Sequence, residues 1–182
     1  MVTIERKGGD RTMESEARGP DPRPDGGGGT PRGGRRATAR LPYEGVWRFT
    51  APAVDSSVPQ ARHAVRDLLA RQGVPVTEDL AQGLLLIVSE LVTNAVKHAA
   101  LLSPTLAVEL AVGAEWVRIA VEDDHPYRPT ALETDHARTG GRGLLLVREI
   151  AREAGGVCDM EHTPSGGKVI WAVLPLHPAP LL

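Results

Sequence analysis

The chain has 182 residues, 41% hydrophobic and 24% charged, which suffices for one globular domain and is too short for two large ones. Its net charge of -2 argues against strong attraction to nucleic acid or to an anionic membrane surface. The single cysteine, Cys158, excludes an internal disulfide and a cysteine-based zinc cluster. Because no signal-peptide pattern and no apolar run approaching ~20 residues is present, the sequence predicts a cytoplasmic protein without a membrane segment.

Residues 1–40 differ in composition from the rest of the chain. They are rich in glycine, proline and charge, so they bury too little apolar surface to offset the entropy lost on ordering. We therefore predict a disordered tail over 1–40 and a folded domain over 41–182. The tail ends in a basic cluster, which either contacts nucleic acid or an acidic partner or, as the balancing acidic residues upstream favour, is a solvated linker. The cluster consists of Arg32, Arg35, Arg36 and Arg40.

The folded part alternates between two kinds of pattern. Apolar residues at every second position predict strands, and apolar residues three and four apart predict helices. In chain order we expect a strand at 46–51, helices at 58–73 and 78–100, a hairpin over 105–123, a long loop over 123–143, a helix over 144–156 and a second hairpin over 157–175.

This order of elements predicts a two-layer α+β sandwich, in which helices cover one face of an antiparallel or mixed sheet. Thr77 is a plausible N-cap for the long helix, because its hydroxyl can accept from an unpaired backbone N–H group. The strand at 46–51 would lie at a sheet edge, where pairing of two copies into a homodimer is possible.

The helix at 78–100 carries polar side chains on an otherwise apolar surface. Residues four apart share a face, so Glu90 and Asn94 form a line with either Lys97 or His98. A carboxylate in an apolar neighbourhood is costly unless a hydrogen bond, a cation or water meets it. The line is therefore either a satisfied buried polar pair or the wall of a ligand site.

A second set of candidate residues lies around the long loop. Asp123 ends a strand, and Gly140, Gly141 and Gly143 precede the next helix. Glycines let backbone amides approach a ligand, and a helix N-terminus offers N–H groups to phosphate. Alone, these glycines would indicate only a flexible helix entry. Together with Asp123 and the polar line, they indicate a site for a phosphate-containing ligand.

Four segments of the sequence resemble the motifs of a known superfamily. ELVTNAVKHA (90–99) is similar to the N box, VEDDHP (121–126) and GGRGLLLV (140–147) to the two glycine boxes, and SGGKVIWAVLP (165–175) to the last strand. The superfamily is that of the GHKL ATPases and kinases, whose histidine-kinase-like ATPase domain has the Bergerat fold. Over residues 46–175 the chain resembles most specifically the anti-sigma-factor serine/threonine kinases of partner-switching systems.

The resemblance implies a site for ATP and Mg²⁺. Glu90 would be the general base, Asn94 would bind Mg²⁺, and Asp123 would accept a hydrogen bond from the adenine amino group. The partners that it implies are a sigma factor and an anti-sigma-factor antagonist protein, with no direct contact to nucleic acid. The other nucleotide-binding residues that it implies are Lys97, His98, Gly141, Arg142, Gly143 and Leu144.

The chain departs from the family pattern at two of these motifs. The first glycine box of the family is DxGxG, and here His125 and Tyr127 replace its glycines, which removes the easy positive-φ conformations. In the last strand Lys168 follows Gly167, where the family often has threonine. The sequence leaves three functions open: a kinase, a non-catalytic partner-binding module with the same fold, and a plain ATPase.

Overall fold

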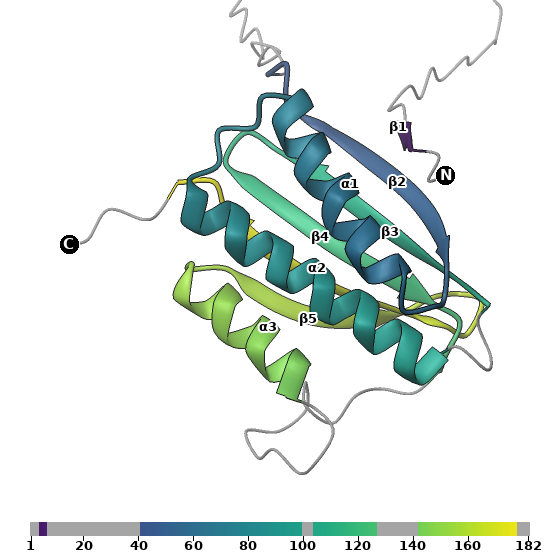
Figure 1. Ribbon diagram of the computed structural model, residues 1–182. Helices are drawn as coiled ribbons and strands as arrows, with labels where there is room; N and C mark the ends of the chain where they lie inside the picture. Colours follow the sequence, from purple (N-terminus) through teal and green to yellow (C-terminus); the bar gives the residue numbers. More distant parts are fainter. Residues whose placement is uncertain (1–3, 7–40, 100–103, 127–141, 178–182) are drawn as a thin grey trace, which may run out of the picture.

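The computed structural model describes residues 4–6, 41–99, 104–126 and 142–177, in which three helices pack on one face of a six-stranded sheet (Figure 1). The helices are α1 (Ser57–Arg71), α2 (Glu78–Ala99) and α3 (Arg142–Glu153). The strands, in the sheet order β1-β2-β3-β4-β6-β5, are β1 (Glu5–Arg6), β2 (Gly45–Pro52), β3 (Thr105–Val112), β4 (Trp116–Asp123), β6 (Lys168–Pro175) and β5 (Val157–His162).

The two-layer α+β sandwich expected from the sequence is confirmed, with one correction. Of the two sheet types that the sequence left open, the described part of the chain has the antiparallel one, because all its strand pairs are antiparallel. Glu5–Arg6, expected in a disordered tail, form β1 and pair with Trp47 and Arg48 of β2. β1 therefore covers part of the edge that the sequence offered for a homodimer. Apart from Ile4, the other residues of the predicted tail, 1–3 and 7–40, lie outside the described residues.

Local sequence explains where the helices begin and end. The N–H group of Leu80 donates to Thr77 Oγ1 at 3.2 Å, so Thr77 caps α2 as expected. Acidic residues fill the first turn of α2, where the helix dipole favours negative charge. After α1 the chain turns at Gly73, whose φ of 63° is a conformation that glycine adopts more easily than other residues.

α2 is the central helix of the layer and packs between α1 and α3, over β4 (Figure 1). Its inner face is almost fully buried, with at most 1% exposure at Leu84, Ile87, Val88, Leu91 and Val92. Over Glu78–Lys97 this helix also has the length and mean hydropathy, 1.3, of a membrane-spanning helix, although no apolar run of that length is expected from the sequence. Its contacts with the sheet and with both neighbouring helices explain that apolar composition as core packing.

α2 and α3 run antiparallel and approach each other closely at two glycines (Figure 1). A Cβ atom added to Gly83 would lie 3.2 Å from Ile150 Cγ2, and one added to Gly143 would overlap the Glu90 carboxylate. The two contacts are about two helical turns apart on both helices. At each contact a glycine on one helix makes room for a longer side chain on the other, so these glycines set the spacing between the helices.

Candidate functional site

Glu90 and Asn94 lie one turn apart on α2, and both side chains are half-buried. Neither side chain has a hydrogen-bond or ion-pair partner among the residues that the structure describes. The satisfied polar pair that the sequence allowed is therefore not formed within these residues. Half-buried polar groups without protein partners are hydrogen-bonded by water or by a ligand, so this carboxylate and this amide are available to contact a ligand.

The Glu90 carboxylate lies against the beginning of α3. Its contact there is Gly143, the second residue of the helix, where a side chain would overlap the carboxylate oxygen Oε2. The first turn of any helix has N–H groups without intrahelical partners, and these attract anions. The fold thus places a hydrogen-bond acceptor beside an anion-binding helix end. Gly143, predicted from the sequence to approach phosphate, also makes room for the proposed base.

Asp123 ends β4 with its side chain buried and paired with a cation. Lys168 Nζ, from the first residue of β6, lies 2.7 Å from Asp123 Oδ1, and the two residues are opposite each other in the sheet. The N–H group of His125 donates to the same oxygen at 2.9 Å, and the His125 carbonyl oxygen accepts from Lys168 Nζ at 3.2 Å. The carboxylate expected to select adenine is therefore held by an ammonium group and a backbone amide.

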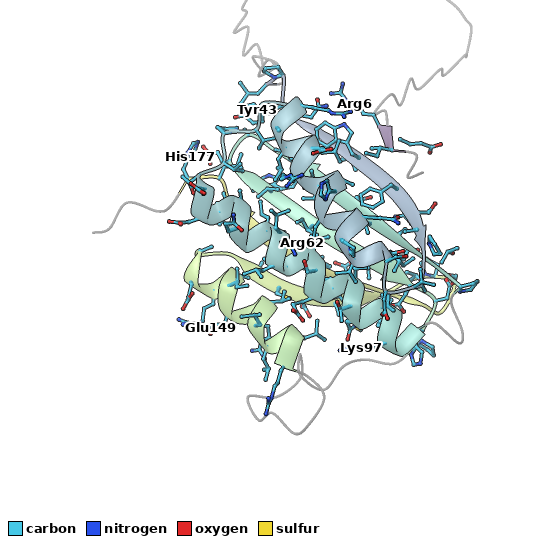
Figure 2. All side chains as sticks on the ribbon, in the orientation of Figure 1. Arg6, Tyr43, Arg62, Lys97, Glu149 and His177 are labelled. Atoms are coloured by element: carbon cyan, nitrogen blue, oxygen red, sulfur yellow. The ribbon has the colours of Figure 1, made fainter. Side chains whose placement is uncertain are left out.

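The other predicted residues are placed differently by the structure. Lys97 is exposed near the end of α2 (Figure 2), and Arg142 is exposed at the first position of α3. The side chain of Leu144 is only 3% exposed and belongs to the core, so a ligand can contact this residue only through its backbone. The predictions that fall outside the described positions are those for Gly141, Tyr127 and the side chain of His98.

Asn94 offers a fitting ligand for Mg²⁺, because its side-chain oxygen is not bonded to any of the described residues. Mg²⁺ prefers oxygen ligands and keeps several waters, so a single protein ligand together with phosphate oxygens is sufficient. Within the described ranges no three His, Cys, Asp or Glu side chains gather into a metal-binding group. The donor set therefore fits a cation that arrives with the nucleotide phosphates rather than one held by protein alone.

Lys168 is the residue of this site whose partner the motifs do not predict. In the motifs it is only a departure from threonine, yet its position in the strand indicates a buried side chain. Side chains at every second position of a strand lie on the same face. The residues two, four and six positions after Lys168 in β6 are buried, so Lys168 points toward that same buried face; they are Ile170, Ala172 and Leu174. A lysine on a buried face requires an acidic partner, and Asp123 is the buried acidic residue opposite it.

The family model of the histidine kinase-like ATPase domain matches residues 51–173. This range includes Glu90, Asn94, Asp123 and the described part of α3. The chain belongs to the histidine kinase-like ATPase domain family. It is therefore a GHKL-type ATP-binding domain, and the Bergerat-type architecture expected from the motifs is confirmed.

Proteins similar to this histidine kinase-like ATPase domain include sensor proteins and histidine kinases. The chain is 32% identical over 105 residues to the sensor protein IrlS of Burkholderia pseudomallei, a match that spans 50% of this chain and 22% of IrlS. The histidine kinase domain of the blue-light activated kinase of Erythrobacter litoralis EL346 is 24% identical, with a TM-score of 0.46, over 69% of this chain and 61% of that one. The mycobacterial sensor histidine kinase MprB is 18% identical, with a TM-score of 0.44, over 71% of this chain and 99% of that one.

Proposed function

We propose that this chain is an ATP-binding regulatory protein with serine/threonine kinase activity toward an anti-sigma-factor antagonist, and that it also binds the sigma factor. The observation that carries the proposal is the position of the Glu90 carboxylate, which lies against Gly143 at the start of α3 without a partner in the described residues. A general base must be free to accept a proton and must lie within hydrogen-bond reach of the attacking hydroxyl, which itself lies beside the γ-phosphate. The partners are proposed from the resemblance of the motifs, and a cytoplasmic location is proposed from the single cysteine, which fits a reducing compartment.

Each residue of the site would have a separate task in phosphoryl transfer. The amides in the first turn of α3 would hold the phosphates, and Asp123 would contact the adenine. The Asn94 oxygen would hold Mg²⁺, which neutralises charge on the phosphates. Glu90 would take the proton from a serine or threonine hydroxyl of the antagonist while that oxygen bonds to the γ-phosphorus. The bond to the bridging oxygen breaks, and ADP leaves.

One observation favours a second candidate, a binding module without phosphoryl transfer. Asp123 already has a cation in Lys168, and His125, which stands in place of a glycine, binds both partners through its backbone. A carboxylate that already accepts from an ammonium group and a backbone amide has less to gain from binding a nucleotide. In that case the sigma factor and the antagonist would compete for one surface, and release would depend on their concentrations alone.

A test of the kinase uses Glu90→Gln, which preserves the shape of the side chain and removes the base. The acceptor is the partner protein that co-purifies with the chain from its native host and is identified by mass spectrometry. We expect transfer of labelled γ-phosphate to fall by about 10²- to 10⁴-fold. The affinity for Mg·ATP in a calorimetric titration should change little. Glu78→Gln, in the first turn of the same helix, is the matched control and should transfer at the wild-type rate.

The chemistry of the product separates the candidate functions. Phosphoserine and phosphothreonine survive acid, whereas phosphohistidine does not, so acid-stable label on the partner supports the proposed specificity. Acid-labile label would instead assign the chain to histidine phosphorylation. If the wild type binds ATP and transfers nothing, the binding module is the correct function. Near-wild-type transfer by the Glu90→Gln variant would refute the role of this carboxylate.

A further inference from the structure

Lys168 is a buried lysine within the proposed nucleotide site. Its side chain is 1% exposed and that of Asp123 is 2% exposed, and the two are joined by the 2.7 Å ion pair between β6 and β4. A buried ammonium group requires a partner, and so does a buried carboxylate. Mutual neutralisation is therefore one role of the pair, and it would stabilise the sheet whether or not a ligand binds.

The pair has hydrogen-bonding capacity beyond this mutual contact. An ammonium group has three N–H donors, and a carboxylate has two acceptor oxygens. Lys168 uses one donor on Asp123 Oδ1 and a second on the carbonyl oxygen of His125. The N–H group of His125 also donates to Oδ1 rather than to Oδ2. Within the described residues the pair therefore retains one N–H donor on Nζ and the acceptor oxygen Oδ2.

We propose that Lys168 reads the adenine base together with Asp123 and is a specificity-determining residue of this site. The Watson–Crick edge of adenine presents a donor, the amino group on C6, next to an acceptor, the ring nitrogen N1. Asp123 Oδ2 accepts from the amino group, and the third N–H of Lys168 donates to N1. This inference rests on the proposed nucleotide site and adds to it a direct protein donor for N1.

The physical setting makes this hydrogen bond selective. The donor is charged, and both side chains are buried, so water competes little for either group. A base that lacks an acceptor at position 1 would leave the ammonium donor without a partner. A site built around a hydrogen bond discriminates strongly against ligands that cannot make it.

The test is a cycle of two proteins and two ligands. The affinities of wild type and Lys168→Met are measured by calorimetry for Mg·ATP and for 1-deaza-ATP, in which a C–H group replaces N1. In wild type we expect 1-deaza-ATP to bind about tenfold to hundredfold more weakly than ATP, the range for a hydrogen bond from a charged donor. In Lys168→Met the two ligands should bind within about threefold of each other, because the donor is absent.

The cycle separates base reading from a purely structural role. If Lys168 only neutralises Asp123, the substitution weakens both ligands by the same factor, and the inference is overturned. Val169→Thr, the next position in β6 and on the opposite face of the sheet, is the control and should retain the wild-type ratio of the two affinities.

If Lys168→Met does not fold, the wild-type protein alone decides. A loss of affinity below about threefold from ATP to 1-deaza-ATP then overturns the inference. If wild type binds 1-deaza-ATP as well as ATP, the nucleotide proposal stands without Lys168, whereas binding of neither ligand overturns both.

Discussion

Replacing Gly143 by alanine should disable phosphoryl transfer while preserving the fold. An alanine Cβ at this position would lie 3.3 Å from Glu90 Cδ and would overlap Oε2. Because ordinary carbon contacts are about 3.5–4.0 Å, the carboxylate must move away from α3. A displacement of a reacting group by about 1 Å can reduce a rate by ~10²-fold. We therefore expect transfer of γ-phosphate to fall by about two orders of magnitude.

The effect of Gly143→Ala on stability should be small, because two contributions oppose each other. Alanine is favoured over glycine within a helix by about 0.5–1 kcal/mol. Rotating the flexible end of Glu90 out of its preferred conformation costs about 0.5–1.5 kcal/mol. The free energy of unfolding, measured by urea denaturation, should therefore change by less than about 1 kcal/mol.

Gly83→Ala is the matched control, because it makes the same change at the other close contact between α2 and α3. There the added Cβ meets Ile150 Cγ2 at 3.2 Å, an apolar group at a distance from Glu90 of about two helical turns. This variant gains the same helix propensity and should transfer phosphate at the wild-type rate. The reasoning would be refuted if Gly143→Ala transferred within about twofold of wild type, or if both variants lost activity equally.

Two further predictions concern buried groups. Lys168→Met should lower the free energy of unfolding, measured by urea denaturation, by about 3–5 kcal/mol because it leaves Asp123 buried without its cation. The double change Asp123→Leu/Lys168→Met removes both charges and should lower it by less. Equal losses in the two variants would show that the pair is not coupled. Burial, followed by the charge of Asp159, raises the pKa of Cys158 from 9.0 to about 12. The folded protein then keeps the thiol proton while the unfolded chain releases it, so stability should fall between pH 9.0 and about 12, by at most about 1.4 kcal/mol per pH unit. Cys158→Ala should lack this contribution in urea denaturation at several pH values, and an identical pH dependence in both proteins would contradict it.

Local sequence patterns were sufficient to predict most elements of the fold. The helix expected at 78–100 is α2, Glu78–Ala99, and the hairpins expected over 105–123 and 157–175 are β3–β4 and β5–β6. These elements are predictable because apolar periodicity and capping residues act over a few neighbouring positions. β1 was missed because nothing in its own two residues requires a strand. It forms against the edge of β2, where the Arg6 guanidinium lies 5.8 Å from the centre of the Trp47 ring.

The sequence by itself determined which chemical groups the site would contain: a carboxylate and an amide one turn apart on a helix, an aspartate at a strand end and a glycine-led helix. Only the tertiary structure decided their partners. Asp123 and Lys168 lie far apart in the chain and meet because β4 and β6 are adjacent and in register. Glu90 lies against Gly143 because α2 and α3 pack so closely there that a side chain at position 143 would displace the carboxylate. Such contacts depend on how complete elements pack, and no local pattern specifies that arrangement.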